Sequence, residues 1–230
     1  MNPPRTILLD AAGTLIEPSE PVATVYARHF AMAGHDVEES VIRQAFGQVF
    51  RLLPPPDYPA DGDGDAAERL WWRSVVRETA SRCELPSEVA ESGALFDSLF
   101  HHYESGAAWR VFPEVESVLK ELAANGSSLA VVSNFDNRLH RILDDLDLTR
   151  WFAAVITSAD AASRKPDGVI FLHALNKLAR SPSEVVHIGD SAEADQAGAE
   201  NVGIRAFLLD RPRVTLCNAL EWIRSGGERK

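Results

Sequence analysis

The sequence of 230 residues is poor in cysteine and has no long run of apolar residues. Its two cysteines, Cys83 and Cys217, lie far apart, and neither belongs to a CxxC motif or to a cluster with histidine. We therefore expect reduced thiols in a cytoplasmic protein rather than a disulfide framework or a zinc site. No apolar run is long enough to span a bilayer, and Asp10 interrupts the apolar patch near the N-terminus. Neither a membrane anchor nor a signal peptide is expected.

The sequence also lacks an excess of basic residues. Its 23 lysines and arginines are outnumbered by 34 aspartates and glutamates, which gives a formal net charge of −11. This balance argues against nucleic acid or an anionic membrane as the main partner. A small anionic substrate would instead need local positive charge, which one metal ion and one lysine could supply. The hydrophobic content of 45% is sufficient for a core, and the length fits one domain, with or without an inserted subdomain.

The order of apolar patterns predicts an α/β protein. Residues 7–9 form a short apolar run that ends at Asp10, as in a buried parallel strand that presents a carboxylate at its carboxyl end. Ligands bind at that end of the strands in open α/β sheets. Helical spacing of apolar residues then continues to about residue 103, with the last helix expected as one unit from Pro86 to Tyr103. From Trp109 onward helices and strands alternate, which predicts a parallel sheet with right-handed crossovers.

Four polar motifs stand at the edges of apolar runs. They are DAAGTL at 10–15, VVSN at 131–134, RKPD at 164–167 and GDSAEAD at 189–195. In this order and spacing they resemble the haloacid dehalogenase (HAD) superfamily of aspartate-nucleophile hydrolases, and they account for nearly the whole chain. The resemblance implies a HAD-type Rossmann-like core with a parallel sheet, formed by residues 1–17 and 107–230. It also implies an all-helical cap domain, residues 18–106, that closes over the site and selects the substrate.

The resemblance implies a magnesium site at the carboxyl ends of the strands. Carried over residue by residue, the metal ligands are Asp10, the backbone carbonyl of Ala12, and Asp190. Asp195 would position the residues that bind the metal rather than bind the metal itself. Carboxylates that lie close together repel each other unless a cation intervenes, and Mg²⁺ prefers such oxygen ligands together with substrate phosphate.

The same resemblance assigns the catalytic and phosphate-binding groups. Asp10 would be the nucleophile, and the Ser133 hydroxyl and the backbone N–H of Asn134 would hold phosphoryl oxygens. Lys165 would neutralise the charge on Asp10 and on the substrate. Phosphoryl transfer requires mostly positioning and charge neutralisation, which these groups supply.

One position departs from the family pattern. Most HAD phosphatases carry a second aspartate where this sequence has Ala12. That aspartate protonates the leaving oxygen and later deprotonates the attacking water, and such general acid–base catalysis contributes roughly 10² to 10⁴ in rate. We therefore expect weak activity on alkyl phosphates, sugar phosphates above all, and better activity on acyl or aryl phosphates. Glu17, Asp136 or a cap residue are candidate replacements.

Related branches of the superfamily offer alternatives. In 2-haloacid dehalogenases an aromatic residue stands at the position of Ala12 and an arginine holds the halide, a role open to Arg28. The GDxxxxD motif at 189–195 differs from what dehalogenases usually carry. Phosphonoacetaldehyde hydrolases have a motif similar to DAAGT at 10–14, but they require a lysine in the cap. No lysine precedes Lys120 in this sequence, which excludes their usual mechanism. The branch of the rhythmically expressed gene product and the HAD-like hydrolase domain-containing proteins is most similar, through SNFDNRL at 133–139 and a Trp-Trp pair at 71–72.

The sequence thus leaves two classes of function open. The first is a Mg²⁺-dependent hydrolase of phosphatase type that acts on a small phosphorylated metabolite, as a monomer or homodimer. The second is a catalytically impaired pseudo-phosphatase that binds a phosphorylated ligand or a protein partner. Ala12 favours the second class. The retained Asp10, Lys165 and Asp190 favour the first, since a pure binder needs no nucleophile.

Overall fold

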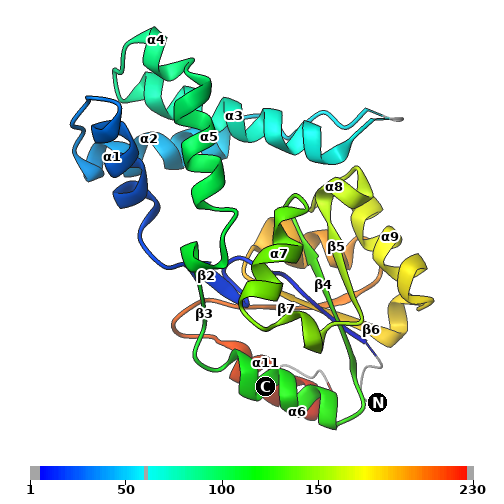
Figure 1. Cartoon of the computed structure of the whole chain (residues 1–230). Helices are drawn as coiled ribbons and strands as arrows, with labels where there is room; N and C mark the ends of the chain where they lie inside the picture. Colours follow the sequence, from blue (N-terminus) through cyan, green and yellow to red (C-terminus); the bar gives the residue numbers. More distant parts are fainter. Residues whose placement is uncertain (1–5, 60–61, 227–230) are drawn as a thin grey trace.

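The centre of the molecule is a five-stranded parallel sheet in the order β5–β4–β1–β6–β7 (Figure 1). The structure, a computed structural model, describes residues 6–59 and 62–226. The strands are β1 (Thr6–Leu9), β4 (Ser128–Ser133), β5 (Ala154–Thr157), β6 (Val185–Gly189) and β7 (Arg205–Leu208). The predicted α/β fold with a Rossmann-like parallel sheet is confirmed, and the first strand of the chain is its central strand.

Burial on both faces of the sheet explains the continuous apolar runs. In β1, Ile7 and Leu9 pack into the core on one face and Leu8 into the core on the other, and all three are fully buried. The first face is covered by α6 (Val115–Ala124), α7 (Arg138–Asp145) and α11 (Leu216–Arg224). The second is covered by α9 (Gly168–Leu178) and α10 (Gly198–Glu200). Each fully buried leucine or isoleucine contributes about 1.5–3 kcal/mol, so the central strand is strongly anchored.

The predicted helical insertion follows the first strand, and Figure 1 places it above the sheet. We call its helices the cap helices: α1 (Val22–Met32), α2 (Glu39–Leu52), α3 (Gly64–Arg82), α4 (Ser87–Ala90) and α5 (Gly93–His102). They surround a core of their own that includes Val25, Phe30 and Leu99. The division into a core domain and a cap domain at residues 18–106 stays a prediction.

The single helix expected from Pro86 to Tyr103 is wrong. The chain forms α4 and α5 instead, and Ser92 between them has an extended backbone with ψ of 121°. Serine followed by glycine is a weak helix-forming pair, because Ser competes for backbone hydrogen bonds and Gly loses the most conformational entropy. The apolar residues keep helical spacing on both sides of this break, which is why periodicity alone did not reveal it.

A short antiparallel ribbon joins the insertion to the sheet layer. It pairs β2 (Ile16–Pro18) with β3 (Trp109–Val111), so that the chain leaves and re-enters at neighbouring positions. Strands of three residues are too short to give a recognisable alternation, and the ribbon was not predicted.

The cap helices also contact the sheet layer at the amino end of α3, which lies against α8 (Ser158–Ala161). Asp65 accepts hydrogen bonds from the backbone N–H and the side-chain amide of Asn137, at 2.8 and 2.7 Å. The buried Glu68 accepts from the hydroxyls of Tyr58 and Ser158. Figure 1 shows α3 passing above α8 at the end of the sheet where the strands terminate. In the described part of the chain no helix combines the length and apolarity needed to cross a membrane.

Candidate active site

Three neighbouring strands end in the residues that the sequence singled out. Asp10 follows β1, and its backbone N–H donates to the carbonyl of Ile188 in β6 at 2.9 Å. Ser133 is the last residue of β4, and Asp190 follows the last residue of β6. Because β4, β1 and β6 are adjacent and parallel, these residues lie at one edge of the sheet.

A buried lysine links two of the carboxylates. Lys165 comes from the segment between α8 and α9 and is 4% exposed. Its Nζ lies 2.7 Å from Oδ1 of Asp10 and 2.5 Å from Oδ1 of Asp195. Burial alone would lower the pKa of Lys165, but the charges of the two paired carboxylates outweigh this and raise it. Lys165 is therefore a cation held between two acids.

Asp195 is kept ionised by its neighbours. Burial opposes its charge, but Lys165 and His187 outweigh that effect and lower the pKa of Asp195. Its Oδ1 contacts both Lys165 and Nε2 of His187, and its Oδ2 accepts from the backbone N–H of Ser191 at 2.9 Å. These contacts use three of the roughly four acceptor positions of a carboxylate. Asp195 thus orients Lys165 and has little capacity left for a further ligand.

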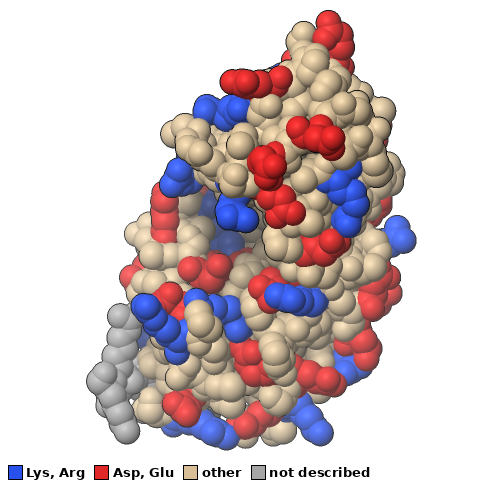
Figure 2. Space-filling view, turned by 90° about the vertical axis from the view of Figure 1, so that its left-hand side faces the viewer, with Lys and Arg blue, Asp and Glu red and all other residues tan. Residues whose placement is uncertain are grey.

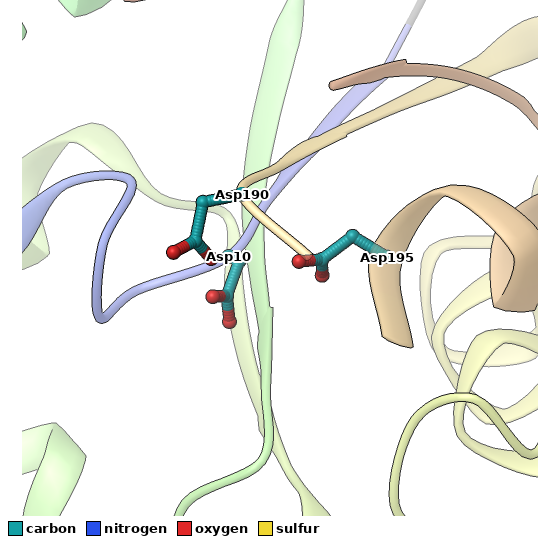
Figure 3. A group of neighbouring side chains, drawn as sticks. All are labelled: Asp10, Asp190 and Asp195. Carbon is teal, nitrogen blue, oxygen red and sulfur yellow. The ribbon is translucent and has the colours of Figure 1, made fainter. Parts of the chain in front are cut away.

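The carboxylates of Asp10, Asp190 and Asp195 form one cluster, with ligand oxygens within 4.8 Å of one another. Figure 3 shows Asp190 at the end of β6 and Asp195 on the following helix, with their carboxyl groups directed toward Asp10. Burial raises the pKa of Asp10, and the charges of Asp195 and Asp190 raise it further against the opposing effect of Lys165. Burial and the charge of Asp195 likewise raise the pKa of Asp190. The charges of these carboxylates therefore repel one another, and Lys165 offsets this repulsion only in part.

Two glycines permit this close packing. Gly13 has φ of +82°, and a Cβ there would lie 2.1 Å from a carboxylate oxygen of Asp190. A Cβ on Gly189 would lie 2.1 Å from the carboxyl carbon of Asp195. Any side chain at either position would displace an acid from the cluster, so both glycines are required by space, and Gly13 is also required by its backbone conformation.

Asn134 has a contact that the sequence did not predict. Its side-chain amide donates to the carbonyl of Lys165 at 2.9 Å and accepts from the N–H of the same residue at 2.7 Å. This pair of bonds fixes the backbone of Lys165 against the end of β4. The sequence assigned only the backbone N–H of Asn134 to the site, because no spacing rule relates residues 31 positions apart.

Sequence reasoning missed two further residues around the site. His187 is fully buried in β6, where its Nε2 contacts Asp195 at 2.9 Å and its Nδ1 has no partner among the described residues. The ionised Asp195 accepts, so Nε2 carries the hydrogen. Arg211 donates to the carbonyls of Gly13 and Thr14, at 3.0 and 2.7 Å. His187 could have been noticed from the sequence, because it lies two residues before the Gly-Asp pair at 189–190. Nothing in the sequence indicated the role of Arg211.

The candidate replacements for the missing aspartate are engaged elsewhere. Glu17 forms an ion pair with Arg110 at 2.8 Å on the antiparallel ribbon. Asp136 is buried and pairs with Arg138 at 2.7 Å. Neither belongs to the acidic cluster of the described residues. Arg28, the candidate halide ligand, pairs with Glu20 at 2.9 Å.

A cleft of about 620 Å³ adjoins the site. Its sheet-layer wall includes Asn134, Lys165 and Ser191, and its cap wall includes Tyr58 and Trp71. The Trp71 ring lies under the guanidinium of Arg164, with 4.4 Å between the guanidinium carbon and the ring centre. On the face seen in Figure 2 the molecule is hollowed between its upper and lower parts, and Lys or Arg side chains are visible within the hollow.

Comparisons with known proteins identify the family of the chain. A family model described as haloacid dehalogenase-like hydrolase matches residues 4–203. The haloacid dehalogenase-like hydrolase domain-containing protein 3 of Danio rerio is 35% identical over 213 residues, which cover 91% of this chain and 86% of that protein. The rhythmically expressed gene 2 protein of Drosophila melanogaster is 24% identical over 216 residues, which cover 89% and 82%.

A solved structure of the HAD-hydrolase YfnB from Bacillus subtilis, bound to magnesium, is similar with a TM-score of 0.68 and 16% identity. The match covers 90% of this chain and 89% of that one. At this identity the likeness supports the fold alone. The predicted superfamily and its predicted branch are confirmed by the sequence relatives. The chain belongs to the haloacid dehalogenase-like hydrolase family and has the fold of a hydrolase of that family.

Proposed function

We propose that the protein is a Mg²⁺-dependent phosphatase that uses Asp10 as its nucleophile on a small phosphorylated compound with a good leaving group. The observation that carries the proposal is the position of Asp10, held by the Lys165 ammonium at 2.7 Å and clustered with Asp190 and Asp195. A buried carboxylate is costly unless it is paired or binds a metal, and Asp10 lies at the edge of the sheet where ligands bind.

The residues present fit a magnesium ion. Asp10 and Asp190 supply hard oxygen donors. Burial, together with repulsion between the carboxylates, raises their pKa values, and a divalent cation between them would relieve that repulsion. The carbonyl of Ala12, in the loop that packs against Asp190 through Gly13, completes the proposed set. When bound, the ion would neutralise charge on the transferring phosphoryl group.

The side chains and backbone groups of the site take different roles in phosphoryl transfer. Oδ1 of Asp10 is held by Lys165, so that Oδ2 is the oxygen that attacks phosphorus. The bond from phosphorus to the leaving oxygen breaks, and that oxygen departs with its electron pair. Water then attacks the phosphorus of the aspartyl phosphate, which restores the Asp10 carboxylate and releases inorganic phosphate. Ser133, the N–H of Asn134 and Lys165 hold the phosphoryl oxygens through both steps.

Ala12 decides which substrates react. No carboxylic acid stands at that position to protonate the leaving oxygen, and Glu17 and Asp136 are occupied in ion pairs. A leaving group that is stable as an anion, such as a carboxylate or a phenolate, does not need the proton. Acyl and aryl phosphates are therefore the proposed substrate class, and sugar phosphates should react roughly 10² to 10⁴ more slowly than in enzymes with the acid.

Ala12 also supports a second candidate function, a binding protein for phosphorylated ligands or protein partners that turns over nothing. The halide-binding alternative has less support, because Arg28 is half-exposed and paired with Glu20. The two leading functions differ in whether the Asp10 carboxylate forms a bond to phosphorus.

The test is Mg²⁺-dependent phosphate release from acetyl phosphate, 4-nitrophenyl phosphate and a panel of sugar phosphates. The wild-type protein should cleave the first two, and Asp10→Asn should reduce the rates to background. Ala12→Asp should add activity on sugar phosphates, because it restores the missing acid. A wild-type protein that is silent on every substrate while Ala12→Asp is active would contradict the proposal and favour the binding protein.

A further inference from the structure

Arg164 is a cationic residue of the cleft that the proposed mechanism does not use. It lies in the segment between α8 and α9, directly before Lys165, and it lines the cleft of about 620 Å³ together with Lys165 and Asn134. A ligand whose phosphoryl group is held by Lys165 and the N–H of Asn134 would therefore have a second positive charge in the same wall. What this charge can bind depends on whether another group of the chain already neutralises it.

The guanidinium group of Arg164 is not neutralised by an acid of the chain. Within residues 6–59 and 62–226 it forms no ion pair and no hydrogen bond. Of its nitrogens only Nε is fully buried, so the two terminal nitrogens are accessible to a ligand. Their N–H groups can donate two hydrogen bonds to one carboxylate or phosphate, which is the strong arrangement for an arginine.

Trp71 of α3 fixes the position of this guanidinium group. The guanidinium carbon lies 4.4 Å from the centre of the Trp71 ring, within the range of a cation–π contact. The ring is itself held in place, because Trp71 is buried and its Nε1 donates to the carbonyl of Pro54 at 2.7 Å. A guanidinium group that is positioned before the ligand arrives loses less conformational freedom when the ligand binds.

Two acidic residues also line the cleft, and neither occupies Arg164. The side chain of Asp167 accepts from the backbone N–H of Val169 at 2.9 Å and so caps α9. Glu193 is exposed and forms no ion pair with Arg164 in the part of the chain that the structure describes. Solvent screens the charges of exposed carboxylates, whereas an anion that reaches Arg164 forms direct hydrogen bonds.

We propose that Arg164 binds a second anionic group of the ligand, so that the preferred compounds carry a carboxylate in addition to the phosphoryl group. The volume of the cleft allows this, since it lies in the range of about 300–1,000 Å³ that is typical of pockets for small organic ligands. Selection of a substrate by Arg164 rests on the proposed phosphatase activity. Binding of a compound with two anionic groups does not require catalysis.

Binding is measured by calorimetry in saturating Mg²⁺, with phosphonates, whose carbon–phosphorus bond the proposed mechanism does not break. The probes are phosphonocarboxylates with two, three or four methylene groups between the phosphonate and the carboxylate. Each is compared with the alkylphosphonate in which a methyl group replaces the carboxylate. The wild-type protein should bind the best phosphonocarboxylate about tenfold more tightly than its alkyl partner. Equal affinities in all three pairs, or no binding of any probe, would overturn the proposal.

Variants of Arg164 test whether this residue causes the preference. Arg164→Gln removes the charge and should reduce the preference to below about twofold. Arg164→Lys keeps the charge but loses the paired N–H groups, so it should lower the preference about threefold. Arg73→Gln removes the same charge from an exposed site of α3 and is the matched control, which should keep the full preference. A wild-type preference in either Arg164 variant would contradict the proposal.

Kinetics separates the role of Arg164 from catalysis itself. The ratio of kcat/KM for the better of 3- and 4-carboxyphenyl phosphate to that for phenyl phosphate should fall about tenfold in Arg164→Gln. If both classes are cleaved and the ratio does not change, selection by Arg164 is wrong while the phosphatase activity stands. If nothing is cleaved but the phosphonocarboxylates bind through Arg164, the proposed phosphatase function fails and the second anion site stands.

Discussion

At the scale of single residues, several side chains hold other residues of the candidate site in position. Asp195 uses both carboxylate oxygens on Lys165, His187 and the backbone of Ser191, and so it holds the lysine rather than a ligand. Arg211 acts in the same way on the loop after Asp10, because its guanidinium N–H groups donate to two successive carbonyls of that loop. Such supporting residues commonly change metal affinity 10- to 100-fold when they are altered.

Arg211→Lys should therefore weaken magnesium binding. A single ammonium group cannot replace the three contacts of the guanidinium with Gly13, Thr14 and Glu114. Without them the loop that carries the Ala12 carbonyl is less well positioned. We expect the Mg²⁺ concentration for half-maximal phosphate release from acetyl phosphate to rise roughly tenfold.

The matched control is Arg213→Lys, on an exposed side chain two residues away. It should keep the wild-type magnesium requirement. Equal requirements in the wild type and Arg211→Lys would mean that the loop is held by its backbone alone.

At the scale of elements, the cap helices carry a pH-sensitive contact of their own. His29 of α1 is buried, with Nδ1 2.7 Å from the hydroxyl of Ser98, and its ring meets that of His102 edge to face. Burial lowers the pKa of His29, and the charges of His102 and Arg28 lower it further. Burial, followed by Arg28, lowers the pKa of His102 as well. The folded cap therefore disfavours protonation at both positions.

This contact predicts the direction of a stability change with pH. Histidine in an unfolded chain titrates near 6.5. Because the folded pKa is lower, the unfolded state binds more protons as the pH falls below about 6.5, and the free energy of unfolding decreases. The urea midpoint of the wild type should be lower at pH 5 than at pH 7.5, and His29→Gln should lose less over this interval.

The exposed His140 provides the control for this experiment. His140→Gln should follow the pH dependence of the wild type. If His29→Gln and the wild type lose equal stability between pH 7.5 and pH 5, the buried pair is not the cause of the acid sensitivity.

At the scale of the whole molecule, a net charge of −11 coexists with a candidate site for which an anionic substrate is proposed. Three acidic side chains meet at the edge of the sheet, and Lys165 contacts two of them, Asp10 and Asp195. The fold holds this cluster together because the buried central strand and its neighbours fix the positions of the acids. The expected cytoplasmic location and the expected monomer or homodimer stay predictions.

Magnesium should stabilise the whole fold through this cluster. A ligand that binds only the folded state at 100 times its Kd adds about 2.7 kcal/mol. For a chain of this length that corresponds to a rise in Tm of roughly 5–10 °C. The measurement is thermal unfolding with EDTA and with saturating Mg²⁺.

Asp190→Asn is the informative variant for magnesium. It removes a proposed ligand, so the rise in Tm with Mg²⁺ should disappear. It also removes a carboxylate whose pKa is raised by burial and by Asp195, and the metal-free variant should therefore be at least as stable as the metal-free wild type. A variant that keeps the full rise in Tm would show that the ion binds elsewhere.

The order of motifs along the chain was enough to determine the fold class, the family and the residues that gather at the site. The strands that end near Asp10, Ser133 and Asp190 can be predicted from short stretches of sequence, because buried parallel strands have continuous apolar sequences. The residues at the carboxyl ends of such strands lie at one edge of the sheet. The absence of an acid at Ala12 is also a property of the sequence alone.

Tertiary structure alone decided which groups support the site. Three of these contacts join residues that are far apart in the sequence. Asn134 and Lys165 are 31 positions apart, Gly13 and Arg211 are 198 apart, and Asp65 and Asn137 are 72 apart. The cavity lined by Tyr26, Trp72 and Phe135 likewise forms only where the cap helices meet the sheet layer. Such contacts depend on how packed elements lie against one another, and no periodicity or spacing in a single sequence encodes that arrangement.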